Sequence, residues 1–313
     1  MAERVTLREV GLRDGIQMAA SFLPTERKRE WAFRLRDVGL REIELTSFVP
    51  PRVVPQFADA AELARIVPEL DGVVASALVP NLKGAENALA AGIRHLNFVL
   101  SISEAHSLAN VRRTTDEAIA EFHRIAALKD SDAGRDMVLG VGLATSFGCT
   151  LQGAVDPGRV LDVARIVVAG GADELIVADT VGYGNPAQVH RILPPIIDIA
   201  AGRRVICHFH DTRGLGLANV AAALETGVRA FDSSLAGLGG CPFAPGATGN
   251  ICTEDLVYLL HECGIGTGVD LDRLCNVARG FAETTGLDLP GQVMKAGPRL
   301  ALSPLSSVAT ACG

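Results

Sequence analysis

Two histidines separated by one residue, His208 and His210, have the clearest potential for metal chemistry in this chain. They follow the apolar pair Val205-Ile206 in a segment with the composition of a buried strand. Alternate side chains of a strand point to the same side, so both imidazoles could bind one metal ion. The same spacing also fits two structural histidines at a strand end, and the rest of the chain must decide between these interpretations.

A second group of polar residues follows a short strand candidate near the N-terminus, in the segment Gly11 to Gln17. Asp14 would add a carboxylate to the two imidazoles, and three such ligands leave a divalent ion with open positions for a substrate. Arg13 and the metal would supply local positive charge for an anionic substrate, which a chain of net charge −7 needs.

A long loop rich in glycine and proline, residues 236–250, excludes a regular helix and is long enough to be a functional loop or lid over the metal site. Asn250 could offer a carbonyl oxygen to the metal. Cys241 could donate or accept a proton, although a free cysteine is more often a small apolar filler. Gly237-Leu238-Gly239 lacks both the Lys-Ser/Thr of a phosphate-binding loop and the strand-to-helix position of a dinucleotide motif, so both functions are rejected.

The composition excludes several classes of protein. The chain has 313 residues, 48% hydrophobic and 21% charged, and its negative balance gives no basic footprint for nucleic acid. No apolar run reaches the ~18 residues of a membrane span. The seven cysteines have no paired spacing, and the N-terminus has no apolar signal region. Reduced thiols and a cytoplasmic location are therefore expected.

Short apolar runs alternate with amphipathic segments along the chain, which predicts an α/β protein with a (β/α)₈ TIM barrel. An open, doubly wound sheet is the alternative, because alternation does not prove closure. The expected strands are 5–10, 42–46, 73–78, 95–99, 138–143, 174–178, 204–209 and 229–233. The expected helices are 25–38, 59–67, 82–91, 115–128, 157–169, 186–199, 217–226 and 253–262.

Local signals support these boundaries. Asp156, Asn185 and Thr253 are expected to cap helices, and glycines after four helices are expected at the C′ position, namely Gly39, Gly92, Gly171 and Gly227. In a barrel the active site lies at the C-terminal ends of the strands, where Asp14, Glu44, Asp179, His208 and His210 are expected. Residues 1–263 are interpreted as the catalytic barrel, and 264–313 as a short C-terminal helical extension with a helix near 269–286.

At this point the motifs identify a family. The chain resembles the 3-hydroxy-3-methylglutaryl-CoA lyase family, within the wider group of metal-dependent TIM-barrel lyases and Claisen-type synthases. The resemblance covers nearly the whole chain in order, through residues 10–17, 46–50, 54–56, 80–84, 178–182, 208–212, 232–234, 236–250 and 253–258.

The resemblance implies roles for particular residues. The metal, Mg²⁺ or Mn²⁺, would be bound by Asp14, His208, His210 and Asn250. Arg13 would stabilise an enolate and Cys241 would assist proton transfer, while Glu44 and Asp179 would support catalysis. Gln17 and Glu254 would lie near the substrate. Lys83 is a candidate contact for a CoA phosphate, with a solvated surface lysine as the alternative interpretation. Either His208 or Asp14 would be the general base.

The implied reaction is metal-dependent retro-Claisen cleavage of 3-hydroxy-3-methylglutaryl-CoA, or a close 3-hydroxy-3-methylacyl-CoA, to acetyl-CoA and a 3-oxo acid such as acetoacetate. The resemblance further implies an acyl-CoA thioester as partner, a homo-oligomer (dimer or tetramer), and a setting in leucine degradation or ketone-body metabolism. A Claisen-type synthase or aldolase and a non-catalytic metal-binding protein are the alternatives. Departures from the animal pattern at 101–106, 143–153 and Arg213 leave the acyl group open.

Overall fold

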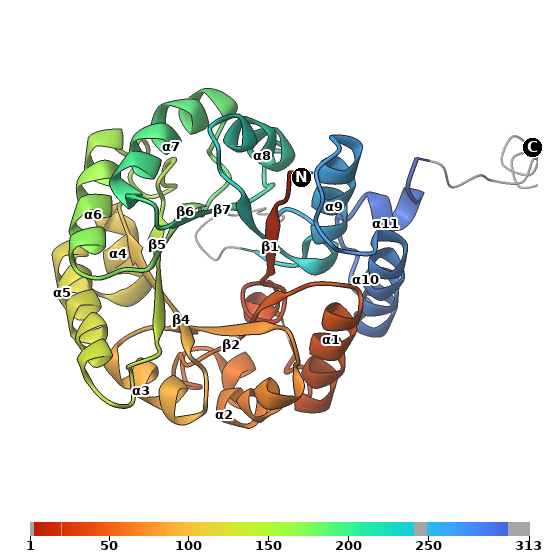
Figure 1. Ribbon diagram of the computed structural model, residues 1–313, viewed down its shortest axis with the longest axis horizontal. Coiled ribbons are helices and arrows are strands. Elements are labelled where there is room, and N and C mark those ends of the chain that lie inside the picture. The colour runs from red at the N-terminus through yellow and green to blue at the C-terminus, as the bar shows by residue number, and fades with distance from the viewer. Residues whose placement is uncertain (1–2, 20, 241–248, 300–313) are drawn as a thin grey trace, which may run out of the picture.

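Eight strands, all pairing in parallel with their neighbours in chain order, close into a barrel in the computed structural model (Figure 1). The structure describes residues 3–19, 21–240 and 249–299. The closure confirms the TIM barrel and excludes the open sheet. The strands are β1 (Thr6–Glu9), β2 (Glu42–Ser47), β3 (Val74–Val79), β4 (His95–Ser101), β5 (Val138–Ala144), β6 (Glu174–Asp179), β7 (Arg204–Phe209) and β8 (Ala230–Ser233).

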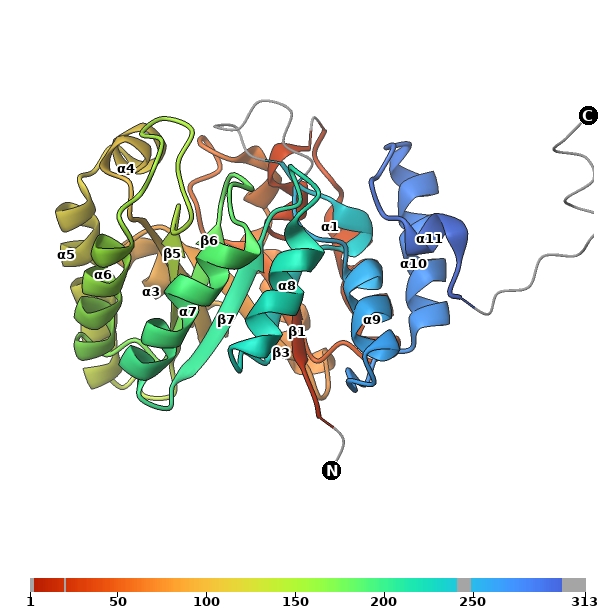
Figure 2. The ribbon, with the colours of Figure 1, turned by 90° about the horizontal axis from the view of Figure 1, so that it is seen from above.

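Helices surround the barrel and cover the outer faces of the strands (Figure 2). Because both faces of a parallel barrel are buried, strands such as β6 are buried along their whole length. The α-helices are α1 (Thr25–Asp37), α2 (Ala60–Leu63), α3 (Leu82–Ala90), α4 (Glu104–Val111), α5 (Thr115–Ala126), α6 (Pro157–Ala169), α7 (Pro186–Ala200), α8 (Gly216–Glu225), α9 (Thr253–Glu262), α10 (Leu271–Thr285) and α11 (Val293–Ala296).

The helix starts confirm two of the three expected caps. The side chains of Asp156 and Asn185 accept hydrogen bonds from the backbone N–H groups of Gly158 and Gln188. The expectation for Thr253 was wrong, because Thr253 is the first residue of α9 and its hydroxyl donates to the Glu9 carboxylate instead. Cys252 occupies the N-cap position, so the Thr253 hydroxyl lies inside the helix and acts as a donor to a buried carboxylate.

All four expected C′ glycines have positive φ angles, between +93° and +106°. This conformation is open to glycine and strained for other residues, which explains why glycine ends these helices. Gly39 additionally faces the backbone of Gly268, where an added Cβ would overlap a carbonyl oxygen. The α1–β2 turn is thus packed directly against the segment that leads into α10.

Two helical predictions needed correction. The expected helix 59–67 is short, because α2 ends at Leu63 and the chain continues as the 3-10 helix Ala64–Glu69, which contains Pro68. Proline lacks the N–H that an α-helix would need there. No helix was predicted at α4, whose start is capped by the Ser103 side chain accepting from the His106 N–H.

The C-terminal helices lie beside α1, against the outside of the barrel (Figures 1 and 2). Trp31 of α1 and Phe281 of α10 are in contact, with ring centroids 3.8 Å apart. The helix expected near 269–286 is therefore confirmed, while the division of the chain at residue 263 stays a prediction. Among the described residues, no helix is long and apolar enough to cross a membrane.

Candidate active site

The loop after β1 presents Arg13 and Asp14 through a tight turn. The carbonyl oxygen of Val10 accepts three successive N–H groups, those of Arg13, Asp14 and Gly15, at 3.0, 2.7 and 3.2 Å. The chain then enters the 3-10 helix η1 (Gly15–Met18). This turn leaves Asp14 partly exposed, with 15% of its side chain accessible, and Arg13 more buried beside it.

The two histidines meet Asp14 at the C-terminal end of β7. Their Nε2 atoms lie 3.1 Å apart, and the Asp14 Oδ2 atom is 3.9 Å from His208 Nε2 and 3.6 Å from His210 Nε2. In the part of the chain that the structure describes, these three residues form the single group of acidic, histidine or cysteine side chains that could hold a metal ion.

Asn250 joins this group through the backbone and its side chain. It forms an isolated bridge with His210, and its amide nitrogen donates to Asp14 Oδ2 at 2.6 Å. Its amide oxygen is buried and has no hydrogen-bond partner among the described residues. A buried acceptor without a partner is costly unless a ligand satisfies it. The proposed fourth metal ligand therefore lies beside the other three.

The charges around Asp14 keep it ionised. Burial alone would raise the pKa of Asp14, but the Arg13 guanidinium and the two imidazoles outweigh it and lower the pKa well below its usual range. Arg13 donates from Nη1 to Asp14 at 2.5 Å and from Nε to Glu44. Glu44 lies within β2, deeper in the barrel than the strand-end position expected for it.

Three charged or polar residues of the barrel interior were missed by the sequence analysis. Asp232 accepts from His208 Nδ1 at 3.1 Å, Arg8 pairs with Asp232, and Asn97 connects Arg8 to Glu44. Asn97 stands between Leu96 and Phe98 in β4, and a polar residue between apolar neighbours was the available signal there. Arg8 and Asp232 have polar neighbours in β1 and β8, so their strands gave no such signal. Burial would raise the pKa of Asp232, but Arg8 and His208 lower it to about 2.

Two further candidates are Asp179, at the end of β6, and Gln17, in the 3-10 helix after β1. Asp179 ends β6 and accepts from the N–H groups of Tyr183 and Gly184 at 2.8 and 2.9 Å. Burial raises the pKa of Asp179 despite these bonds. Gln17 is half-buried in η1, next to the Arg13–Asp14 turn.

Glu254 and Lys83 lie in contrasting surroundings. Glu254 is fully buried at the start of α9, where it accepts from the Ala236 N–H, so it braces the base of the glycine-rich loop. Lys83 is 76% exposed and pairs with Glu86 on the surface of α3. It lines a separate hollow of about 380 Å³ that Arg113 also lines.

Cys241, the candidate thiol, lies outside the described residues. The described ends of its loop are held together, because Gly239 and Gly249 both have positive φ angles and lie against each other. A Cβ at Gly249 would overlap the backbone of Gly239, and a Cβ at Gly239 would overlap the Asn250 side chain. Glycine is therefore required at both positions for Asn250 to reach the site.

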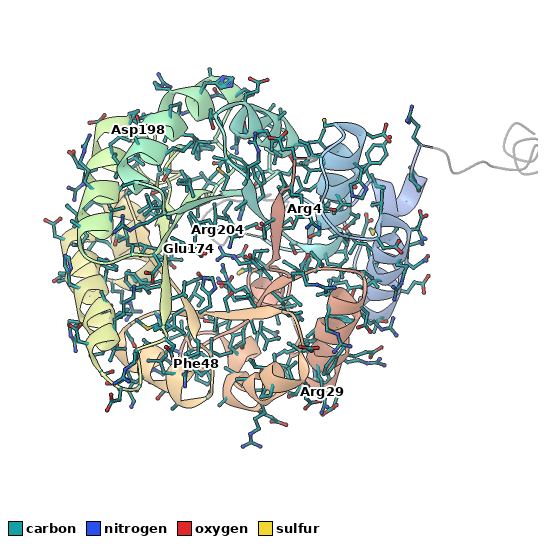
Figure 3. The ribbon with its side chains drawn as sticks, in the orientation of Figure 1. Arg4, Arg29, Phe48, Glu174, Asp198 and Arg204 are labelled. Atoms are coloured by element: carbon teal, nitrogen blue, oxygen red, sulfur yellow. The ribbon has the colours of Figure 1, made fainter. Side chains whose placement is uncertain are left out.

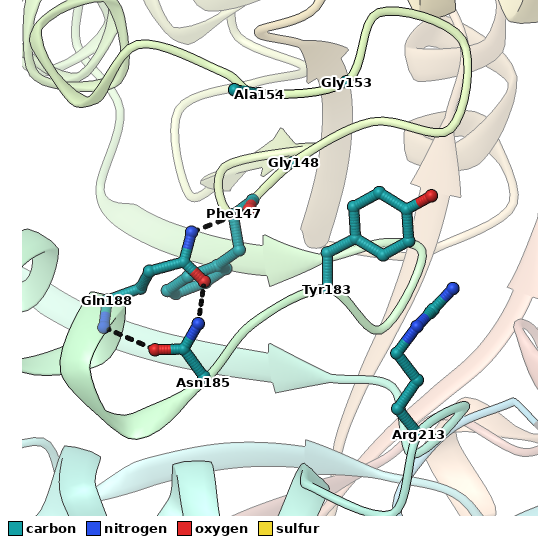
Figure 4. A pocket seen from close by; sticks show the side chains of 8 residues that line it. All are labelled: Phe147, Gly148, Gly153, Ala154, Tyr183, Asn185, Gln188 and Arg213. Atoms are coloured by element: carbon teal, nitrogen blue, oxygen red, sulfur yellow. Dashed lines mark hydrogen bonds between the residues drawn. The ribbon is translucent and has the colours of Figure 1, made fainter.

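A hollow of about 540 Å³ lies beside the loops that follow β5, β6 and β7 (Figure 4). Arg213 stands over the Tyr183 ring at 4.4 Å and donates to the carbonyl oxygens of Val181 and Gly182, both at 3.0 Å. Arg213 therefore braces the loop after Asp179. The hollow is lined by Phe147, Gly148, Gly153, Ala154, Tyr183, Asn185, Gln188 and Arg213.

Four of the other histidines have structural partners. His95 pairs with Glu174 at 2.9 Å, His106 with Ser101 at 2.7 Å, His190 with Glu225 at 3.0 Å and His261 with Thr267 at 2.9 Å. His123, the fifth, lies on α5, where its ring packs beside Phe122.

Comparison with known proteins identifies the family of this barrel. The HMGL-like family model matches residues 4–280. The chain belongs to the HMGL-like family. The hydroxymethylglutaryl-CoA lyase YngG of Bacillus subtilis is 38% identical over 93% of this chain and 96% of its own length. The (R)-citramalyl-CoA lyase of Chloroflexus aurantiacus is 42% identical over 95% of this chain and 96% of its own.

Solved structures agree with this assignment. An HMG-CoA lyase from A. baumannii, in complex with coenzyme A and 3-methylmalate, superposes with a TM-score of 0.92 at 39% identity, covering 96% of this chain and 98% of that one. The resemblance recognised from the motifs is thereby confirmed for this chain of the HMGL-like family.

Proposed function

We propose that this member of the HMGL-like family is a divalent-metal-dependent carbon–carbon lyase that cleaves 3-hydroxy-3-methylglutaryl-CoA to acetyl-CoA and acetoacetate. The convergence of Asp14, His208 and His210 beside Arg13 carries the proposal. It brings a carboxylate and two imidazoles that could bind a metal close to a fixed cation at one strand-end site. Relatives that are lyases of two related acyl-CoA substrates support the same chemistry.

The donor set fits a hard divalent cation such as Mg²⁺ or Mn²⁺. One carboxylate and two imidazole nitrogens face one another, and the unpartnered Asn250 oxygen is a further oxygen donor. Mixed nitrogen and oxygen ligands suit an octahedral ion with positions left for substrate. A bound cation would supply Lewis-acid polarisation of the substrate oxygens.

The protein's own residues account for the remaining steps. A base, either His208 or Asp14, takes the proton of the tertiary hydroxyl, whose oxygen then forms a carbonyl as the adjacent C–C bond breaks. The bonding electrons pass to the thioester as an enolate, and the Arg13 guanidinium neutralises that charge. Protonation of the enolate carbon completes acetyl-CoA, and we assign the assistance of this step to the Cys241 thiol.

The supporting residues hold this machinery in place. Glu44 fixes the Nε side of Arg13, while Asp179 orders the loop that Arg213 braces. We propose that Gln17 borders the acyl-CoA, that Glu254 supports the site by bracing the loop base, and that Lys83, beside the cationic Arg113, meets the CoA phosphates. A dimer or tetramer stays a prediction for this protein.

Citramalyl-CoA is the second candidate substrate, because a citramalyl-CoA lyase is 42% identical to this chain. Citramalyl-CoA lacks one methylene between its carbinol carbon and its carboxylate. The same bond cleavage would therefore release pyruvate in place of acetoacetate. Discrimination by a single methylene is worth about 1–3 kcal/mol in a binding site, so both activities need direct comparison.

The test is a pair of coupled assays with Mn²⁺ or Mg²⁺, in which acetoacetate and pyruvate are measured separately from the two thioesters. We expect acetoacetate release from 3-hydroxy-3-methylglutaryl-CoA, with the larger kcat/KM. His210→Ala should weaken Mn²⁺ binding about tenfold or more, since loss of a ligand costs at least as much as loss of its support. Cleavage that survives exhaustive chelation would contradict the metal requirement, and pyruvate as the preferred product would reassign the substrate.

A further inference from the structure

Beneath the proposed metal site, four polar side chains cross the barrel interior from β8 to β2. Asp232, Arg8, Asn97 and Glu44 come from four different strands, and none is more than 2% exposed. A buried row of this kind requires every charge to be paired and hydrogen-bonded. Its hydrogen bonds show which residue organises the row.

Arg8 makes contacts in both directions. Its Nε and Nη2 atoms donate to the two carboxylate oxygens of Asp232, each at 2.8 Å, and Nη1 donates to the Asn97 side-chain oxygen at 3.1 Å. The planar guanidinium fork is required for this pattern, because a lysine ammonium cannot present paired donors in fixed directions. Arg8 therefore fixes the orientations of two neighbours at once.

Each neighbour supports one half of the active site. Asp232 lies 3.1 Å from His208 Nδ1, the ring nitrogen that faces away from Asp14. The Asn97 amide donates to Glu44 Oε1 at 2.7 Å, and the other Glu44 oxygen accepts from Arg13. The row thus joins the histidine that would bind metal to the arginine that would stabilise the enolate.

We propose that Arg8 is a positioning residue for both halves of the active site. It aligns Asp232, which holds the proton of His208 on Nδ1 and leaves Nε2 as the lone pair directed at the metal position. Through Asn97 it also aligns Glu44 and, with it, Arg13. The metal part of this inference rests on the proposed function, whereas the alignment of His208 does not depend on it.

Arg8→Lys tests the proposal while keeping the buried positive charge, and Arg204→Lys is the matched control. Arg204 pairs with Glu42 and Glu174. These three are the first residues of β7, β2 and β6, at the opposite end of β7 from His208 and His210; Figure 3 labels Glu174 and Arg204. Both variants are compared with the wild type by circular dichroism and thermal unfolding, so that loss of folding is recognised.

Three measurements on the folded variants decide the outcome. We expect Arg8→Lys to raise the Mn²⁺ Kd about tenfold in calorimetry and to lower kcat at saturating metal. In ¹⁵N NMR of the metal-free protein, neutral His208 should carry its proton on Nδ1 in the wild type and shift towards the Nε2–H form in Arg8→Lys. Arg204→Lys should leave the Mn²⁺ Kd and kcat within about twofold of the wild type and the His208 tautomer unchanged.

Asn97→Ala separates the two branches. It removes the link to Glu44 and leaves the Arg8–Asp232 pair, so kcat should fall with little change in KM, in the Mn²⁺ Kd or in the His208 tautomer. If Arg8→Lys keeps the wild-type tautomer, Kd and kcat, or if Arg204→Lys changes them equally, the proposal is wrong. A wild-type protein that binds no Mn²⁺ would refute the metal assignment, while the tautomer measurement would still decide the role of Arg8.

Discussion

Arg13 is held between two carboxylates, Asp14 and Glu44, and its positive charge lies beside the proposed metal position. Its proposed partner, the enolate oxygen, carries full charge only as the C–C bond breaks. Arg13→Gln should therefore lower kcat about 10²-fold or more with a modest change in KM. Steady-state kinetics at saturating Mn²⁺ check this expectation. A steep rise in KM at unchanged kcat would make Arg13 an anchor for the bound substrate instead.

The buried carboxyl group of Glu254 predicts how the stability of the protein depends on pH. Burial raises the pKa of its carboxyl group to about 8, so the folded protein holds the Glu254 proton more tightly than the unfolded chain. The contribution of this protonated group to the stability of the fold is fully present below the ordinary glutamate pKa, and it is lost as the pH rises through about 8. Burial likewise raises the pKa of nearby Glu9 to about 7, with the same sign.

Glu254→Gln should therefore gain stability relative to the wild type as the pH rises from 5 to 8. Glutamine resembles the protonated carboxyl group and has no charge to bury. Urea unfolding at both pH values measures the change, and the comparison of the two differences cancels any constant effect of the substitution. An equal difference at pH 5 and pH 8 would show that Glu254 does not titrate differently on folding.

Two glycines that follow helices have similar backbone angles but different surroundings, so their substitutions can be compared directly. Gly39 after α1 and Gly92 after α3 have φ angles of +106° and +93°, so alanine strains both backbones to a similar degree. The space around them differs, because a Cβ at Gly39 would overlap the Gly268 carbonyl oxygen while nothing lies within 4 Å of a Cβ at Gly92.

Gly92→Ala should cost about 1–2 kcal/mol of unfolding free energy from backbone strain alone. Gly39→Ala should cost at least ~1 kcal/mol more, since the segment leading into α10 must move. Denaturant unfolding of the two variants measures both values. Equal losses would mean that this segment yields without cost, and that α10 is only loosely attached to the α1–β2 turn.

For the whole molecule, the proposed metal ligands join distant parts of the chain, from the loop after β1 to the end of β7 and the segment after β8. A metal ion that binds only the closed barrel should therefore stabilise the complete fold. At a free Mn²⁺ concentration of about one hundred times Kd, the expected gain in unfolding free energy is about 2.7 kcal/mol.

Thermal unfolding with and without Mn²⁺ measures this gain. His210→Ala should lose most of it at the same concentration, whereas His190→Ala should keep it, because His190 pairs with Glu225 on the outer surface. An equal Mn²⁺ effect in both variants would place the binding somewhere other than the Asp14–His208–His210 group.

Much of this protein follows from local sequence. Alternating apolar runs predict the eight strands because a strand buried on both faces must be apolar, and C′ glycines mark helix ends because only they adopt positive φ without strain. His208 and His210 share one side because side-chain direction alternates along a strand. These properties depend on residues close together in the chain, and the sequence alone determined them.

The tertiary structure decided the contacts between residues that are far apart in the sequence. Barrel closure brings β8 beside β1, and only then do Asp232 and Arg8 pair, 224 residues apart in sequence. The same closure sends the Thr253 hydroxyl to Glu9 rather than to its own helix, and turns Glu254 into a buried brace. Such partners compete with local preferences and win because buried charges must be paired, so no local pattern in the sequence could have shown them.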